Sequence, residues 1–134
     1  MANILVIEDE KLLLEVISKK LALSGMNPIS CSGGEEALDC LEKLSVMPDV
    51  IWLDYHLKGM DGLVFLEAIK KNKKWEKIPV VVVSNSASSD EVHHMLALGI
   101  NKYILKAEYR LDQIVEAIKE FISSETNNEK SIGG

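Results

Sequence analysis

Five side chains with chemically useful groups each follow a short apolar run in this sequence. The groups are three carboxylates, one hydroxyl and one ammonium: Glu8 and Asp9 after the first run, Asp54 after the third, Ser84 after the fourth and Lys106 after the fifth. If the runs are parallel strands, their carboxyl ends meet at one edge of a sheet, where open α/β sheets bind their ligands. We therefore expect the five groups to converge in one site.

Such a site would need a cation and could accept a phosphoryl group. Clustered carboxylates raise one another's pKa unless a positive charge lies among them. Mg²⁺ prefers oxygen ligands and commonly takes one or two protein carboxylates, while water and phosphate oxygens complete its shell. An aspartate in such a site can attack phosphorus and form an acyl phosphate. Ser84 and Lys106 would then contact the phosphoryl oxygens that the metal leaves free.

The elements that must position these groups alternate along the chain. Short apolar runs predict strands at residues 4–7, 28–31, 50–53, 80–83 and 102–105. The third and fourth runs show no polar alternation, so both faces of these strands should be buried at the centre of the sheet. Amphipathic stretches with apolar residues three and four positions apart separate the runs and predict helices. This order predicts a doubly wound α/β fold, with a five-stranded parallel sheet covered on both faces.

Several residues mark where the helices should begin and end. Two pairs match the capping-box spacing: Ser32 with Glu35, and Ser88 with Glu91. Asp61 stands at the expected start of the third helix, where we interpret it as an N-cap rather than a metal ligand. Gly25 is expected to end the first helix, because glycine accepts the left-handed conformation common after a helix.

The composition indicates one globular domain. The chain has 134 residues, of which 47% are hydrophobic and 27% charged, and we expect the domain at residues 1–124 and a polar, disordered tail at residues 125–134. A net charge of -6 argues against direct nucleic-acid binding. The absence of a secretory segment or a membrane-length apolar stretch favours a cytoplasmic protein. Cys31 and Cys40 lack metal-binding spacing, and Cys40 is expected to pack as a small hydrophobic residue.

Four motifs in this order resemble the receiver domains of two-component response regulators, including the single-domain chemotaxis type. They are the run from Ile4 to Glu10, the Asp54 segment through Met60-Asp61-Gly62, Ser84, and the run from Tyr103 to Lys106. The resemblance spans about residues 3–123. It implies a flavodoxin-like fold of five βα units with strand order 2-1-3-4-5. It also implies phosphorylation on aspartate by a histidine kinase or a histidine phosphotransfer protein.

The resemblance assigns roles to the residues of the acidic cluster. Asp54 would be the phosphoacceptor. Asp9 and Asp54 would bind Mg²⁺ directly, and Glu8 would bind it through water. The backbone carbonyl of His56 would complete the protein's share of the metal ligands.

The resemblance also implies a conformational switch. Ser84 would move toward the phosphoryl group, Lys106 would contact it, and Tyr103 would change rotamer. The change would reach the face formed by the fourth helix, the fifth strand and the fifth helix, which would bind a downstream protein or a second copy of the chain. Because the domain would phosphorylate and dephosphorylate only itself, we expect it not to be an enzyme.

Three positions depart from the family pattern. Ala107 follows the active-site lysine where many relatives have a proline after a cis peptide, and a cis bond before alanine costs about 2.5 to 4 kcal/mol, which favours a trans bond here. Lys58 replaces a common proline and should loosen the loop after Asp54. Asn85 replaces a smaller residue and could crowd the phosphoryl pocket. His56 and Ser86 occupy positions that tune dephosphorylation in relatives.

Other interpretations stay open at this point. These departures would also suit a receiver fold that serves only as a docking module and is not phosphorylated. A dehalogenase-like phosphatase is less consistent, because His56 stands where that family has a second aspartate. A nucleotide-binding protein is weaker still, since no glycine-rich loop follows the first strand. Asp9 could simply cap the first helix, and Tyr103 could be a static strand residue.

Overall fold

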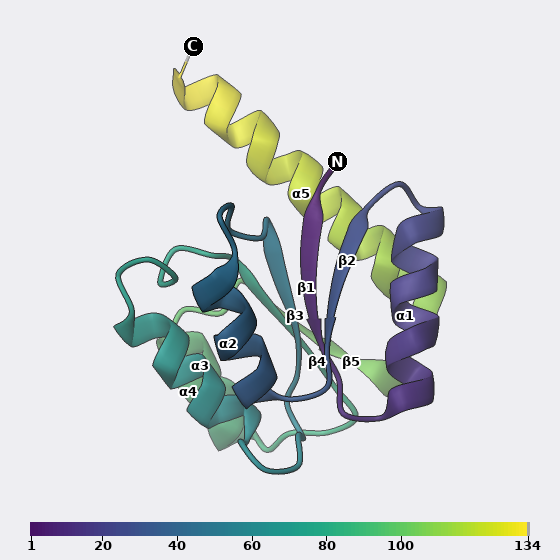
Figure 1. Cartoon of the computed structure of the whole chain (residues 1–134), viewed down its shortest axis with the longest axis vertical. Helices are drawn as coiled ribbons and strands as arrows, with labels where there is room; N and C mark the ends of the chain where they lie inside the picture. The colour runs from purple at the N-terminus through teal and green to yellow at the C-terminus, as the bar shows by residue number, and fades with distance from the viewer. Residues whose placement is uncertain (134) are drawn as a thin grey trace.

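The fold is a five-stranded parallel sheet between two layers of helices (Figure 1). The computed structural model describes the backbone of residues 1–133 and the side chains of residues 1–125. The strands are β1 (Asn3–Ile7), β2 (Asn27–Cys31), β3 (Val50–Asp54), β4 (Val80–Ser84) and β5 (Lys102–Leu105). Their order in the sheet is β2-β1-β3-β4-β5, and every neighbouring pair is parallel. The predicted flavodoxin-like topology is confirmed.

The helices cover both faces of this sheet. They are α1 (Lys11–Leu23), α2 (Gly34–Lys43), α3 (Gly62–Lys71), α4 (Ser89–Ala97) and α5 (Leu111–Gly133), with a short 3-10 helix η1 (Lys106–Glu108) before α5. Helices α1 and α5 lie on one face, and α2, α3 and α4 lie on the other (Figure 1). None of the helices in the described part of the chain is long and apolar enough to cross a membrane.

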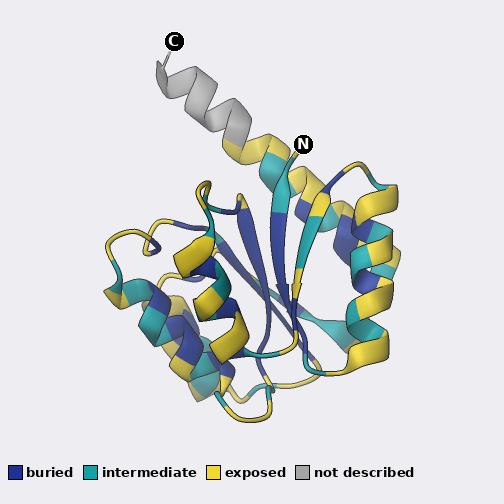
Figure 2. Ribbon diagram, viewed as in Figure 1, coloured by how far each residue is buried: buried dark blue, intermediate teal, exposed yellow. Residues whose placement is uncertain are grey.

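Alternating side chains of the strands fill two separate cores. In β1, Leu5 and Ile7 pack toward α2, α3 and α4, whereas Ile4 and Val6 pack toward α1 and α5. Every residue of β3 and β4 is buried, as the unbroken apolar runs predicted (Figure 2). Burial on both faces fixes the register of these strands, because a slip by one residue would move every side chain to the opposite face.

Helix ends agree with the sequence patterns in two cases. Ser88 and Glu91 form a complete capping box at the start of α4, with distances of 3.1 Å from the Glu91 N–H to the Ser88 hydroxyl and 2.9 Å from the Ser88 N–H to the Glu91 carboxylate. Gly25 follows the last turn of α1 with a φ of 85°. Its N–H donates to the Ala22 carbonyl, so it ends the helix as expected.

One predicted cap is wrong, and another is confirmed in its position but not in its hydrogen bond. Helix α2 begins after Gly33 rather than Ser32, and Ser32 bonds the Glu36 carboxylate through its N–H and its hydroxyl instead of pairing with Glu35. The glycines at the turn move the helix start by one residue, so the Glu that comes within reach is one position later. Asp61 holds the N-cap position of α3, but its side chain makes no capping hydrogen bond.

Two other expectations concern the interior and the end of the chain. Cys40 is only half-buried and packs against the core cluster that contains the buried Cys31, and both cysteines are free. The backbone of helix α5 is described as far as Gly133, and the disordered tail expected at residues 125–134 stays a prediction. No glycine or proline interrupts residues 111–131, so the helical backbone can continue. Residue 134 lies outside the described backbone.

The capping box of α4 gives a test of local stability. Ser88→Ala removes the hydroxyl that accepts the Glu91 N–H, so we expect the free energy of unfolding to fall by about 1 kcal/mol. Urea unfolding followed by circular dichroism measures it. Ser89→Ala, at the exposed neighbouring position, is the matched control and should cost less than half as much. Equal losses in the two variants would contradict the capping assignment.

Candidate functional site

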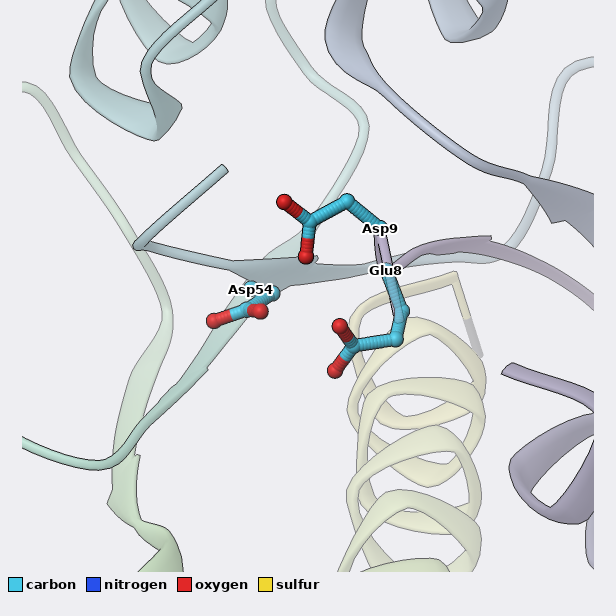
Figure 3. A group of neighbouring side chains, drawn as sticks. All are labelled: Glu8, Asp9 and Asp54. Carbon is cyan, nitrogen blue, oxygen red and sulfur yellow. The ribbon is translucent and has the colours of Figure 1, made fainter. Parts of the chain in front are cut away.

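Three carboxylates meet at the carboxyl edge of the central strands (Figure 3). Glu8 and Asp9 directly follow β1, and Asp54 is the last residue of β3. These two strands are neighbours in the sheet, with Ile7 opposite Leu53, so the residues after this pair lie side by side. One oxygen from each carboxylate lies within 4.8 Å of the others. The predicted convergence of the acidic residues is therefore observed.

Lys106 enters the same cluster from the end of β5. Its Nζ lies 3.1 Å from Glu8 Oε1 and 3.8 Å from Asp54 Oδ2. At an effective dielectric constant of about 20, a unit charge pair at these distances interacts by roughly 4 to 5 kcal/mol, and two carboxylates 4.8 Å apart repel by roughly 3 kcal/mol. One ammonium therefore offsets about one carboxylate, and the others still repel. This surplus of negative charge suits a divalent cation.

The pKa of Asp54 is raised above that of an ordinary aspartate. Burial of the carboxyl group is the largest cause and raises its pKa to about 7. The Lys106 ammonium lowers the pKa, and the charge and hydrogen bonding of Glu8 raise it again. The His56 N–H, 3.3 Å from Asp54 Oδ1, lowers it slightly. Desolvation together with Glu8 outweighs the one nearby cation, so Asp54 keeps its proton to a higher pH than an ordinary aspartate does.

Backbone N–H groups hold the carboxylates in place. Glu8 Oε2 accepts a hydrogen bond of 3.0 Å from the Glu10 N–H. Asp9 Oδ2 accepts one of 2.9 Å from the Lys58 N–H. Lys58 thus ties this loop to Asp9 through an N–H that a proline would lack, and the looser loop expected from Lys58 stays a prediction. Asp9 does not cap α1 either, since Glu10 occupies the N-cap position.

Ser84 reaches the site edge but bonds elsewhere. It is the last residue of β4, one position beyond Val83, which lies opposite Asp54 in β3. Its fully buried hydroxyl donates to the Ser86 carbonyl at 3.0 Å and accepts from the Ser86 N–H at 3.3 Å. The structure thus brings Ser84 beside the carboxylates while its hydroxyl is engaged in a turn with Ser86. Asn85, between them, is exposed.

The remaining predicted residues surround this centre. Tyr103 in β5 is half-buried, and its hydroxyl oxygen is buried without a hydrogen-bond partner among the described residues. The Lys106–Ala107 peptide is trans, as the alanine favoured, and Ala107 lies in η1. The His56 carbonyl as a metal ligand stays a prediction. Sequence reasoning missed Tyr55, which follows Asp54 directly and is 3% exposed.

The fold and this acidic site define a class of protein, and the comparisons with known proteins agree. The family model for the response regulator receiver domain matches residues 4–119. The chain therefore belongs to the receiver domain family of response regulators, which receives signals from histidine kinases in two-component systems.

Curated relatives include whole proteins of several sizes. The chain is 29% identical over 105 residues to the chemotaxis protein CheY homolog of Campylobacter jejuni, covering 78% of this chain and 80% of the relative. It is 31% identical over 104 residues to the phosphate regulon transcriptional regulatory protein PhoB of Klebsiella pneumoniae, covering 78% of this chain. The chain spans 44% of the length of PhoB. It is also 26% identical over 119 residues to the sensor histidine kinase CheAY of Helicobacter pylori, and this match covers 87% of this chain and 15% of CheAY.

Solved structures show the same architecture. The phosphorylated cyanobacterial phytochrome response regulator RcpA is 32% identical, with a TM-score of 0.80 and coverage of 92% of this chain and 95% of that chain. The Mn²⁺-bound form of response regulator Rcp1 is 30% identical, with a TM-score of 0.79 and coverage of 90% and 94% respectively. Both alignments include nearly all of the described domain.

The raised pKa of Asp54 predicts a pH-dependent stability. A folded-state pKa near 7, above the ordinary aspartate value of 3.8, means that the folded protein holds this proton more tightly than the unfolded chain. The stability that this proton provides is complete below pH 3.8 and is lost up to about pH 7. Asp54→Asn removes this loss, so its stability gain over the wild type should grow by up to about 1.4 kcal/mol per pH unit within this window and level off above it.

Urea unfolding at pH 4.5, 6 and 7.5 without divalent cations tests this expectation. Asp61→Asn is the matched control, because Asp61 is an exposed carboxylate in the same loop. The effect of Asp61→Asn on the free energy of unfolding should be small, because this side chain is exposed. A gain for Asp54→Asn that stays constant across the three pH values would contradict the burial-driven shift.

Proposed function

We propose that this chain is a phosphoacceptor switch of a two-component phosphorelay, with Asp54 as the phosphorylated residue. The observation that carries the proposal is the clustering of Glu8, Asp9, Asp54 and Lys106 at the carboxyl edge of the sheet. The donor would be a phosphohistidine on a histidine kinase or a phosphotransfer protein. Two similar proteins support this, since RcpA is described as phosphorylated and Rcp1 as Mn²⁺-bound.

The acidic cluster fits Mg²⁺ through its charge and its oxygen donors. Asp9 and Asp54 would bind the ion directly, Glu8 through water, and the His56 backbone carbonyl would add a further oxygen. When bound, the ion would neutralise charge on the carboxylates and on the phosphoryl oxygens. The Lys58 N–H bond to one Asp9 oxygen leaves the other oxygen of that carboxylate available.

The chain's own groups would then carry the transfer. An Asp54 oxygen forms a bond to phosphorus as the phosphorus–nitrogen bond of the donor histidine breaks, and the leaving imidazole takes up a proton. The Lys106 ammonium, 3.8 Å from Asp54, would move from the carboxylate to a phosphoryl oxygen. Because the domain turns over no separate substrate, we describe it as a phosphoacceptor rather than an enzyme.

The response would pass through Ser84 and Tyr103. The Ser84 hydroxyl would leave the Ser86 carbonyl and donate to the phosphoryl group. A buried hydroxyl without a partner costs roughly 1 to 3 kcal/mol, so the resting position of Tyr103 is poorly satisfied and a rearrangement that gives it an acceptor would be favoured. The altered face of α4, β5 and α5 would then regulate a partner protein or form a homodimer.

Intact-mass measurement with a small phosphodonor tests the assignment of Asp54. With acetyl phosphate and Mg²⁺, the wild type should gain the mass of one phosphoryl group, and Asp54→Asn should gain none. Asp61→Asn, which changes an exposed carboxylate in the same loop, should behave as the wild type. Removal of Mg²⁺ with a chelator should abolish the gain. Labelling of Asp54→Asn would overturn the site, and an inert wild type would favour a docking module that is not phosphorylated.

Lys106→Ala separates phosphorylation from the response. Loss of the ammonium should leave the fold and the acidic cation site in place, because Asp9, Asp54 and Glu8 are unchanged. Without it, the phosphoryl group loses a contact that would draw β5 toward the site. We expect amide NMR shift changes of residues 84–91 and 102–105 on beryllofluoride binding to fall by at least half relative to the wild type. Changes of wild-type size would show that Lys106 has no part in the switch.

A further inference from the structure

A direct hydrogen bond joins the loop after the phosphoacceptor to the loop before α4. The first loop, residues 55–61, follows Asp54, and the second, residues 85–88, follows Ser84. His56 Nε2 lies 2.5 Å from the carbonyl oxygen of Ser86. Because a carbonyl can only accept, the Nε2 atom carries the hydrogen and donates it. This bond spans thirty positions of sequence and is made by an exposed side chain.

A rigid neighbour holds the His56 ring in this position. The ring packs edge-on against Tyr55, with centroids 5.1 Å apart and planes at 80°. Tyr55 is buried and is fixed by α3, because Gly62 donates to the Tyr55 carbonyl and a Cβ atom at Gly62 would lie only 2.6 Å from that oxygen. The ring of His56 is therefore oriented by packing rather than free at the surface.

Tyr55 makes a second link to the same region. The Glu91 carboxylate accepts hydrogen bonds from the Ser88 N–H and from the Tyr55 hydroxyl. Both bonds lower the pKa of Glu91, and the bond from Ser88 has the larger effect. Glu91 belongs to the capping box that starts α4. Two consecutive residues after Asp54 thus hold the β4–α4 connection at two points, one on each side of the α4 N-cap.

The Ser86 carbonyl is also the present acceptor of the Ser84 hydroxyl, at 3.0 Å. This one oxygen therefore receives both the hydroxyl that must turn toward a phosphoryl group and the His56 N–H. A loop that moves with Ser84 would carry the Ser86 carbonyl away from a ring that Tyr55 holds still. Breaking this bond adds to the free energy that the phosphoryl group must supply.

We propose that His56 is a positioning residue that latches the β4–α4 loop in its resting arrangement through the Ser86 carbonyl and so sets the affinity of the activated state. This inference rests on the proposed phosphoacceptor function and adds a regulatory role for a side chain outside the carboxylate cluster of Glu8, Asp9 and Asp54. The role belongs to the imidazole N–H and is separate from that of the His56 backbone carbonyl.

Two substitutions of similar size distinguish the hydrogen bond from the bulk of the ring. His56→Leu keeps an apolar side chain over Tyr55 but has no donor, whereas His56→Gln retains an amide N–H that can reach the same carbonyl. His94→Leu removes an exposed histidine of α4 outside these loops and serves as the control. The affinity for beryllofluoride, measured at saturating Mg²⁺, and amide hydrogen exchange of residues 85–91 without ligand are the two readouts.

The latch predicts opposite behaviour for the two variants. A hydrogen bond of this kind contributes about 0.5 to 1.5 kcal/mol, so His56→Leu should bind beryllofluoride about two- to tenfold more tightly than the wild type. Its amides at residues 85–91 should exchange faster by a similar factor. His56→Gln and His94→Leu should stay within twofold of the wild type in both measurements.

The contrary results are equally clear. Equal shifts for His56→Leu and His56→Gln would assign the effect to ring size and overturn the latch, and so would unchanged loop exchange in His56→Leu. A wild type that binds no beryllofluoride and accepts no phosphoryl group would refute the proposed function instead. In that case the exchange rates of the unliganded loop still decide whether His56 holds it.

Discussion

Glu8, Asp9 and Asp54 place carboxylate oxygens within 4.8 Å of one another, and two of the three residues are buried. Repulsion among these charges is only partly offset by Lys106, which reaches Glu8 and Asp54 but is a single ammonium. The site therefore carries excess negative charge, which a proton on Asp54 or a divalent cation can neutralise. Backbone N–H groups of the adjoining loops donate hydrogen bonds to these three carboxylates.

The sheet tolerates the repulsion among these carboxylates because its central strands are buried on both faces. All residues of β3 and β4 are inaccessible or nearly so, and two apolar cores flank them. Packing of this kind holds the strand ends in register, so the charged groups cannot relax by moving apart. The apolar core thus provides stability at the strand centres, and the strand ends hold an arrangement that would be unfavourable alone.

The two loops beside the site link its charge to α4. Asp54 leads directly into Tyr55 and His56, which contact Glu91 and Ser86 at the other loop. Ser84 shares the Ser86 carbonyl with His56, so the end of β4 and the loop after Asp54 both donate to the same oxygen. The proposed switch would act through this shared acceptor, because a local charge alters a distant surface only through an element that can take two arrangements.

The sequence by itself determined the strands, their burial and the edge at which the chemistry lies. Unbroken apolar runs such as residues 80–83 predict strands that are buried on both faces. The polar residue that follows each run then lies at the end of a strand. The capping box at Ser88 and the stop at Gly25 were also predictable, because such signals act within one turn. Local spacing misplaced the α2 cap, where Ser32 bonds Glu36 instead of Glu35.

Only the tertiary structure decided the contacts between loops that are far apart in sequence. The Lys58 N–H reaches Asp9 across 49 positions, and His56 reaches Ser86 across 30, so no local pattern encodes either bond. The raised pKa of Asp54 likewise depends on burial and on Glu8, neither of which can be measured along the chain. Residue type and periodicity determine which groups arrive at the sheet edge, whereas distance, desolvation and shared acceptors, which exist only after folding, determine what those groups do there.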